Sequence, residues 1–371
     1  MTETVLDTAV IGAGAAGLHV GRLLMDRGMS AELFDAHPRV GDSWRERYRS
    51  LRIFSPSRVS SLPGLPLDVG FFRFPTAQQM GDYLERYATR FGIVVRTDAA
   101  VAGLTRDDSG RFRLDLANGD AVLAHRVVVA AGAHRTPKLP EFARDLDPGI
   151  TQVTSIDYRG PEQLAPGDVL VVGAGNSGTD IALEAARNGH RVTIAGRHPG
   201  QVPVDVDTPI GNILSGIFLS RLRHLTIDTE KGRAAKETHR GIMLIRNKLA
   251  DLDRAGITRV ARIESVVDGL PVTADGAAID AATVVWATGS RPDLGWIRID
   301  GVLDAEGEPL HDRGMARRCA GLAFVGLDFQ HSAASGALFG MGADAEYVVD
   351  ALCSVERPAE RPGTRVGEAV I

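Results

Sequence analysis

Cysteine is scarce in this chain: among 371 residues it occurs only at Cys319 and Cys353. These two positions form no C-x-x-C pair, which argues against a disulfide framework, a zinc ribbon and a dithiol redox centre. Long apolar runs are also missing, and none approaches the roughly 18 residues that span a bilayer. The first residues, MTETVLD, are acidic and lack the cationic and apolar regions of a secretory signal. We therefore expect a cytoplasmic protein without a membrane partner.

A basic surplus is missing too. The net charge is −5 at pH 7, so the chain provides no positive field for nucleic acid. The ten histidines are scattered and form no H-E-x-x-H pair, so we expect no metal site. The apolar content of 44% and the charged content of 24% are ordinary for a globular protein, and the length allows two domains with a core each.

Glycine, by contrast, is abundant at 42 residues, and part of it marks an internal repeat. Segments 7–35 and 168–196 each show an apolar strand, a glycine turn, a helical stretch and a second strand. Their landmarks align without a gap: Asp7 with Asp168, Gly12 with Gly173, Gly14 with Gly175, Gly17 with Gly178, and Gly28 with Gly189. The same β-α-β unit therefore occurs twice.

The first unit has the pattern of a dinucleotide site. Gly12 suits a tight turn, Gly14 lets the backbone approach a pyrophosphate, and Gly17 lets the helix lie close to the sheet. The helix N-terminus offers free N–H groups to the phosphates. Asp35 ends the second strand, where a carboxylate accepts both hydroxyls of an adenosine ribose, as in FAD. The contacts expected of this unit are Gly12, Gly14, Ala16, Gly17, Asp35 and Ala36.

The second unit differs at the position of that carboxylate, where Gly196 and then Arg197 stand. Removing the acid removes its repulsion of a 2′-phosphate, and a guanidinium can pair with that phosphate, which favours NADPH. Alternatively, Arg197 is a solvated arginine at a strand end, and His198 either assists or is a surface histidine. The contacts expected of this unit are Gly173, Gly175, Asn176, Ser177, Gly178, Arg197 and His198.

The order of these units predicts the domain organisation. We expect the α/β class, with two Rossmann-like dinucleotide-binding domains and the NADPH domain inserted into the FAD domain. The expected parts are 1–155 (FAD domain, first part), 156–290 (NADPH domain, with a helical insert at 201–256), 291–355 (FAD domain, return) and 356–371 (a disordered tail). The insert has two interpretations, a lid over the cofactor junction or helices that pack the domains together.

Local patterns predict several further elements. Segment 78–91 has helical periodicity, and a long terminal helix is expected from about Ala333 to Leu352. A buried strand at 127–131 ends in Gly132, and the similar phrase TVVWATGSRP closes the second unit at 283–292. Segment 44–67, rich in Arg, Ser and Pro, has the pattern of an extended loop over a ligand.

Two dinucleotide sites in one chain imply hydride transfer from a nicotinamide to a flavin. With these motifs in view, the chain resembles the class B flavoprotein monooxygenases, in the short bacterial branch of the flavin-containing monooxygenase group, over about residues 5–352. Besides the two glycine turns, the resemblance rests on GDSWRERYRSLRIFSPSR at 41–58, FPTAQQMGDYLERYA at 74–88, the AAG and ATG closures at 130–132 and 287–289, and FVGLDFQHSAASGALFGMGADAEYV at 324–348.

The resemblance implies further cofactor contacts. The loop of Gly41, Ser43 and Trp44 would lie along the flavin, although Trp44 also suits a core position. The backbone of Val101 would meet the adenine. The strand end at Gly326 to Asp328, followed by a helix N-terminus near Ser332–Gly336, would hold the ribityl chain and the pyrimidine edge of the flavin. The closures add Ala131, Gly132, Thr288 and Gly289.

One group motif is degenerate. The fingerprint F-x-G-x-x-x-H-x-x-x-F/Y would run through Pro148, Ile150, Thr154 and Tyr158, so only its final aromatic residue matches. Thr154 in place of histidine puts the domain-coupling role of the motif in doubt. Tyr158, where the Baeyer–Villiger branch has tryptophan, argues weakly against Baeyer–Villiger chemistry. Ser55 stands about where related enzymes place an asparagine near the flavin. The expected catalytic donors are Ser55 and Arg197.

The resemblance implies an FAD- and NADPH-dependent monooxygenase that forms a C4a-hydroperoxyflavin and oxygenates a small N- or S-nucleophile or a ketone. Its partners would be a small substrate and O₂, and a homodimer is possible. A disulfide reductase would need a cysteine pair. A reductase or oxidase that acts on small electron acceptors without oxygen insertion stays open, as does a redox-sensing flavoprotein without catalysis.

Overall fold

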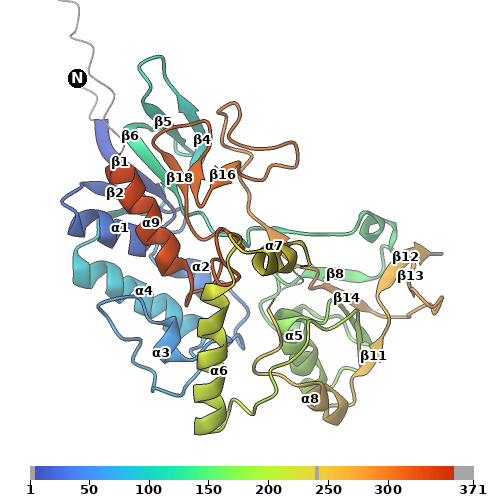
Figure 1. Ribbon diagram of the computed structural model, residues 1–371. Coiled ribbons are helices and arrows are strands. Elements are labelled where there is room, and N and C mark those ends of the chain that lie inside the picture. The colour runs from blue at the N-terminus through green and yellow to red at the C-terminus, as the bar shows by residue number, and fades with distance from the viewer. Residues whose placement is uncertain (1–4, 239–241, 355–371) are drawn as a thin grey trace, which may run out of the picture.

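The computed structural model describes residues 5–238 and 242–354 and shows two lobes (Figure 1). The first domain is built on a nine-stranded sheet, and the second domain on a five-stranded sheet. Because the second sheet lies between two parts of the first in the sequence, the expected α/β class with one inserted domain is confirmed. The tail expected at 356–371 lies outside the described residues.

The first sheet has the order β16-β17-β18-β6-β1-β2-β3, and β4 and β5 extend it as an antiparallel hairpin beside β6. Strands β18, β6, β1, β2 and β3 are mutually parallel. Ile11 is level with Phe34 and Val129, so three central strands end together at one edge. The bounds are β1 (Val5–Ile11), β2 (Ala31–Phe34), β3 (Val95–Arg96), β4 (Val101–Arg106), β5 (Phe112–Leu116), β6 (Ala121–Val129), β16 (His311–Asp312), β17 (Met315–Ala316) and β18 (Leu322–Phe324).

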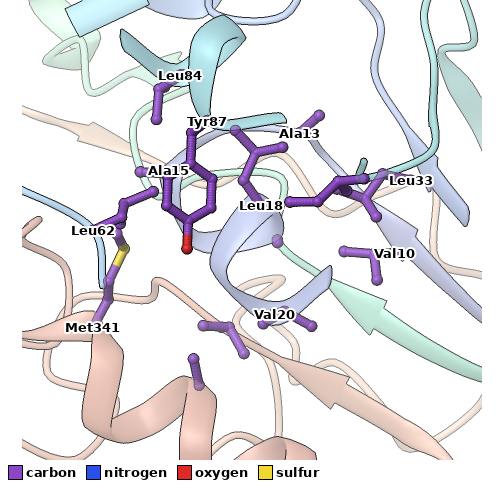
Figure 2. Packing of buried hydrophobic residues seen from close by; sticks show 14 of the residues in the cluster. Val10, Ala13, Ala15, Leu18, Val20, Leu33, Leu62, Leu84, Tyr87 and Met341 are labelled. Atoms are coloured by element: carbon purple, nitrogen blue, oxygen red, sulfur yellow. The ribbon is translucent and has the colours of Figure 1, made fainter. Parts of the chain in front are cut away.

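Helices α1 (Ala15–Asp26), α4 (Ala77–Phe91) and α9 (Met341–Cys353) pack around one core on this sheet. Figure 2 shows Leu18 and Val20 of α1 beside Val10 and Leu33 of the strands. Such continuous apolar strands are expected where a parallel sheet is covered by helices. The predicted helix at 78–91 is confirmed, and its start at Thr76 carries a capping box with Gln79.

The second sheet is entirely parallel, in the order β11-β10-β9-β14-β8. Helix α5 (Asn176–Arg187) connects β9 to β10. Strand β8 precedes residue 156, so the second sheet begins earlier in the chain than the expected division. The bounds are β8 (Thr151–Thr154), β9 (Val169–Val172), β10 (Val192–Ala195), β11 (Thr258–Val260) and β14 (Thr283–Trp286), with a separate hairpin of β12 (Ile263–Val267) and β13 (Leu270–Thr273).

The two passages of the chain between the domains pair with each other. Strand β7 (Thr136–Pro137) leads out of the first domain, and β15 (Ser290–Arg291) leads back into it. They form a short antiparallel ladder, and the side-chain hydroxyl of Thr288 also donates to the carbonyl of Lys138. The chain therefore passes between the two domains at one two-stranded connection.

The insert at 201–256 divides its helices between the two domains. Helix α8 (Leu249–Arg254) leads from β10 toward β11 and packs on the second-domain core through Leu252. Helix α6 (Pro209–Arg221) instead shares a core cluster with Phe74 and Phe339 of the first domain. Helix α7 (Glu230–Glu237) follows a bridge between Thr226 and Ser332. The remaining short helices are α2 (Asp42–Arg45), α3 (Ser57–Ser60), η1 (Glu141–Asp145), η2 (Pro161–Gln163) and η3 (Leu222–His224).

The terminal helix begins later than the sequence suggested. We expected it from about Ala333, with an N-terminus near Ser332–Gly336, but α9 begins at Met341. The Ser335 hydroxyl accepts hydrogen bonds from the backbone N–H groups of His331 and Ser332, which holds this segment in turns. Serine hydroxyls compete in this way with helical backbone bonds. The expected helix N-terminus at 332–336 was therefore wrong.

Candidate functional site

The first glycine turn leaves no room for side chains at two of its three positions. Gly12 has a φ of 103°, and a Cβ there would lie 2.4 Å from the carbonyl oxygen of Ala130. A Cβ on Gly17 would lie 1.8 Å from the carbonyl oxygen of Gly12. A Cβ on Gly14, in contrast, would meet nothing within 4 Å. The turn is thus closed toward the protein and open at Gly14, as approach to a pyrophosphate requires.

Asp35 follows β2 and is already held by three hydrogen bonds. Its carboxylate accepts from the backbone N–H of Ala13 at 2.7 Å, and from the backbone N–H and ring Nδ1 of His37 at 2.9 and 2.7 Å. Burial acts to raise the pKa of Asp35, but the bonds from His37 and Ala13 outweigh it and hold that pKa below its usual value. The carboxylate raises the pKa of His37 in turn. Asp35 is therefore a fixed anion next to the first turn.

The second glycine turn repeats the geometry of the first. A Cβ on Gly173 would lie 2.2 Å from the carbonyl oxygen of Ala287, and one on Gly178 would lie 1.9 Å from that of Gly173. Gly175 again faces open space. Asn176 directs its side chain away from this space, since its amide donates to the carbonyls of Ile242 and Met243. Ser177 is exposed at the start of α5.

A cleft of about 390 Å³ lies at the end of β10, beside the second turn. Arg197 and His198 line it together with Arg259 of β11, and all three are exposed. Sequence reasoning missed Arg259, because 62 residues separate it from Arg197 and no motif surrounds it. Arg259 forms a salt bridge with Asp253 at 3.2 Å, so a phosphate in this cleft would meet Arg197 and would share Arg259 with that carboxylate.

The segment expected along the flavin is fixed by a close backbone approach. Gly41 has a φ of 92°, and a Cβ there would lie 2.2 Å from the carbonyl oxygen of Gly81 in α4. The buried guanidinium of Arg45 pairs with Asp42 and Asp82 at 2.8 and 2.9 Å. Ser43 and Trp44 are half-buried, and Trp44 packs against the first core.

The other expected cofactor residues gather at the carboxyl edges of the two sheets. Because parallel strands end at the same edge, segments that follow them converge there. Ala131 and Gly132 follow β6, and Gly326 follows β18 with its Cβ position 3.3 Å from that of Ala16. Val101 begins β4 and is half-buried. Exposed or half-buried positions at these edges also include Ala36, Thr288, Gly289 and Asp328.

Ser55 does not have the surroundings expected of a catalytic donor. Its side chain is 1% exposed, and its hydroxyl lies 2.8 Å from that of Ser60. The Ser60 hydroxyl also contacts the carbonyl of Ser55 at 3.1 Å. The two serines therefore stabilise the loop at 55–60. This loop has no recognisable sequence motif, so the burial of Ser55 could not be predicted.

Sequence reasoning also missed a polar contact between the domains. The hydroxyl of Tyr48 donates to Asp180 of α5 at 3.0 Å, and Asn247 donates to the same carboxylate at 2.6 Å. Arg246 donates to Asp180 at 3.4 Å and to the carbonyl of Arg52 at 3.1 Å. Burial raises the pKa of Asp180, although Arg246 and the hydrogen bonds act to lower it.

The degenerate fingerprint lies beside this contact. The side-chain hydroxyl of Thr154 donates to Asp157 at 2.6 Å, within its own turn. Tyr158 is fully buried, donates to Glu184 at 2.9 Å and packs against the ring of Tyr48 at a centroid distance of 6.1 Å. Burial next to Glu184 raises the pKa of Tyr158. The surviving aromatic of the motif is thus a structural residue of the domain interface.

No helix in the described ranges, 5–238 and 242–354, is long and apolar enough to cross a membrane. Over the same ranges, no group of three or more His, Cys, Asp or Glu side chains is arranged to hold a metal ion. Cys319 is buried and Cys353 exposed, and both are free thiols.

Comparison with known proteins agrees with this geometry. The family model of the pyridine nucleotide-disulphide oxidoreductases matches residues 9–245. An uncharacterized CzcO-like oxidoreductase of Geobacillus kaustophilus is 35% identical over 94% of this chain and 98% of its own. The indole-3-pyruvate monooxygenase YUCCA1 of rice is 32% identical over 59% of this chain and 54% of its own.

Among solved structures, a flavin-containing monooxygenase from Stenotrophomonas maltophilia superimposes with a TM-score of 0.77 at 24% identity. The match covers 94% of this chain and 98% of that one, so both domains share its fold. The resemblance inferred from the sequence motifs is confirmed. By the family model and by its full-length relative, the chain is a member of the pyridine nucleotide-disulphide oxidoreductase family.

Proposed function

We propose that the protein is an FAD- and NADPH-dependent monooxygenase that acts on a small nitrogen or sulfur nucleophile or a ketone. One oxygen atom of O₂ enters the substrate, and the other leaves as water with the two electrons of NADPH and one proton. The observation that carries the proposal is the pairing of two open glycine turns whose neighbouring groups have opposite charge, Asp35 at the first and Arg197 with Arg259 at the second.

The residues of the first domain fit FAD. Open space at Gly14 admits a pyrophosphate to the N-terminus of α1, and the fixed carboxylate of Asp35 is an acceptor for ribose hydroxyls. When bound, the flavin supplies the redox and oxygen chemistry. The chain itself binds and orients the cofactor, and the Gly41 segment holds its shape through the contact with Gly81.

The residues of the second domain fit NADPH. Gly175 faces open space at the start of α5, and the cleft at the end of β10 brings Arg197 and Arg259 together. The positive cleft distinguishes a 2′-phosphate from a free hydroxyl, whereas a carboxylate at this position would repel the phosphate. We therefore assign Arg197 to cofactor recognition.

In this proposal, the insert forms one wall of the substrate-binding site. The backbone of Ile227 donates to the carbonyl of His331 at 2.9 Å, and Ala333 donates to the carbonyl of Leu225 at 3.0 Å. These bonds fix the insert beside the segment that follows β18. The imidazole of His331 also contacts Asp228 at 2.7 Å. Residues 225–228 thus pack the insert against the first domain, and a lid over the cofactor junction stays a proposal.

A second candidate is NADPH oxidation with peroxide release or reduction of a small acceptor. The observation that favours it concerns Thr154, which replaces the histidine of the fingerprint. Its hydroxyl donates to Asp157 within its own turn and is therefore used locally rather than for coupling the two domains. A disulfide reductase is less well supported, because Cys319 contacts Arg106 and Cys353 contacts Met29, which leaves the two thiols apart.

Product analysis under ¹⁸O₂ tests the proposal. The purified protein, loaded with FAD and supplied with NADPH, is offered amines, thioethers and ketones, and the products are examined by mass spectrometry while peroxide is measured in parallel. We expect one labelled oxygen in an organic product and less peroxide when that substrate is present. If peroxide accounts for all NADPH consumed with every substrate class, the second candidate replaces the first. Reactions without substrate give the background of peroxide release.

A further inference from the structure

Helix α6 exposes four large apolar side chains, which is unusual for a helix on the surface of a monomer. The face toward the protein carries Leu219 and four small or polar residues, Gly211, Asn212, Ser215 and Gly216, all of them buried. The outward face carries four large aliphatic residues at helical spacing, with exposed fractions of 73% for Ile210, 43% for Ile213, 47% for Leu214 and 48% for Ile217. A surface helix normally turns such aliphatic residues toward the core.

The inner contacts fix this orientation. Arg58 donates to the side chain and the backbone carbonyl of Asn212, and Asn212 donates to the carbonyls of Phe72 and Val206 at 3.0 and 3.2 Å. A Cβ on Gly216 would lie 2.1 Å from the Arg58 guanidinium, so the helix approaches that side chain as closely as glycine allows. The aliphatic face cannot turn inward without breaking these bonds, and it stays at the surface, where α6 stands between the two lobes (Figure 1).

The two ends of α6 carry opposite charges. Asp205 and Asp207 precede its first turn and are exposed, and Arg221 and Arg223 at its other end are exposed as well. Asp205 and Asp207 act to raise the pKa of Lys248, but within the described residues none of the four forms a direct salt bridge. Arg221 lies four residues after Ile217 and therefore on the same face as the aliphatic residues. A hollow of about 340 Å³ beside this face is lined by Ile213, Ile217 and Arg221, among others.

We propose that α6 is the contact surface for a second copy of this chain, with the two α6 helices packed antiparallel about a two-fold axis near Leu214. The aliphatic residues 210–217 and the charged ends 205–223 have the same midpoint, at residues 213–214. One two-fold axis therefore places the aliphatic face on its copy, Asp207 against Arg221, and Asp205 against Arg223. A two-fold contact must be complementary to itself, and this surface is.

The charge pattern selects a second copy over a lipid surface. Amphipathic helices that lie on membranes carry cations along the polar face to meet anionic lipid. Here the acidic end of α6 would be repelled by the same lipid that attracted its basic end. Against an antiparallel copy, both ends are attracted, and the helix dipoles are also opposed favourably.

Sedimentation velocity of the FAD-loaded protein over a wide concentration range tests this proposal. We expect a dimer, and Ile217→Glu should weaken its association by more than about 100-fold, because an unpaired charge enters the centre of the contact. Asp207→Arg and Arg221→Asp alone should each weaken it by about tenfold or more, and the double variant should restore it to within about threefold. Val267→Glu, at a 54% exposed site on β12, is the matched control and should leave association unchanged.

Circular dichroism and thermal unfolding report whether each variant is folded, and Ile217→Ser supplies a milder change at the same site. A wild-type monomer at every concentration overturns the proposal, as does a dimer that Ile217→Glu leaves intact. Failure of the double charge reversal to restore association overturns the antiparallel arrangement. Flotation with vesicles of phosphatidylglycerol and phosphatidylcholine, if Ile217→Glu abolished it while the wild type stayed monomeric, would assign the face to a membrane instead.

Discussion

Asp35 and His37 show how one residue pair prepares the first glycine turn. The carboxylate raises the pKa of the imidazole, so folding favours protonated His37. That contribution to stability is complete below the unfolded pKa of His37, about 6.5, and is lost as the pH rises through the higher folded pKa. We expect His37→Gln to lower the melting temperature more at pH 6 than at pH 9, as measured by differential scanning fluorimetry.

His190→Gln is the control for that experiment, because the half-buried ring of His190 bonds to a backbone carbonyl, that of Gly167, and not to a carboxylate. A loss for His37→Gln that is the same at both pH values would show that the ion pair with Asp35 adds nothing. At the acid end the sign is opposite for Asp35, whose lowered pKa gives stability that disappears as the pH falls through the folded value.

The arginines of the cleft should decide between the two nicotinamide cofactors. A charge-assisted hydrogen bond is worth about 1.5–3 kcal/mol, or about 10- to 150-fold in affinity. We expect Arg197→Ala and Arg259→Ala each to raise KM for NADPH within that range and to leave KM for NADH nearly unchanged. Arg191→Ala, at the opposite end of β10 and paired with Asp168, should change neither value. No change in either KM would assign both arginines to solvent, and equal changes would assign them to a group that NADPH and NADH share.

Residues at the turns could be predicted from the sequence because their role is local. Gly17 is required by the carbonyl of Gly12 in its own β-α-β unit, and Gly12 by its φ of 103°, although a Cβ on Gly12 would also meet Ala130. Arg259 and the partners of Asp180 could not be predicted, because they meet only once the insert has folded back. Ser55 was assigned by motif position alone, and its burial against Ser60 depends on a turn without a sequence signature.

At the level of elements, α2 and α4 meet through two glycines. A Cβ on Gly81 would lie 2.6 Å from Cγ of Arg45 and 2.8 Å from the carbonyl oxygen of Gly41. We expect Gly81→Ala to destabilise the protein by about 1–3 kcal/mol through overpacking and to weaken FAD retention. Chemical unfolding and the flavin content after gel filtration measure the two effects.

Gly342→Ala in α9 is the matched helix variant. Its Cβ would meet only the His19 ring at 3.7 Å, an ordinary contact. Because alanine favours helix over glycine by about 1 kcal/mol, this variant should be neutral or stabilising. Equal losses for both substitutions would mean that the approach of α2 to α4 is not tight in solution.

The start of α9 shows where element prediction fails. The apolar spacing from 333 to 352 is compatible with one helix throughout, although glycines at 336 and 340 weaken the helix before Met341. The break comes from the Ser335 hydroxyl, which bonds backbone groups at 331 and 332, and from the backbone bridge between Thr226 and Ser332. Neither contact can be inferred from the hydrophobic pattern. The capping box of α4, in contrast, involves residues three positions apart and can be recognised in the sequence.

For the whole molecule, the hydroxyl of Tyr48 is a link between the domains. Removing it leaves the buried carboxylate of Asp180 with one donor fewer, a loss of about 1–3 kcal/mol. We expect Tyr48→Phe to split thermal unfolding into two calorimetric transitions and to slow anaerobic flavin reduction by NADPH. Tyr158→Phe, which loses a bond to Glu184 on the same helix α5, should lower stability without slowing reduction. If both variants slow reduction alike, α5 matters only through its own stability.

The paired strands β7 and β15 have a consequence for how such a chain can be rearranged. The second domain leaves and re-enters through Thr136–Pro137 and Ser290–Arg291, which lie side by side. The two ends of the intervening segment therefore lie next to each other, so the segment can be exchanged as one cassette with adjacent junctions. Exchange of that segment for its counterpart from a relative should transplant the preference for one nicotinamide over the other, while every strand of the first sheet keeps its neighbours.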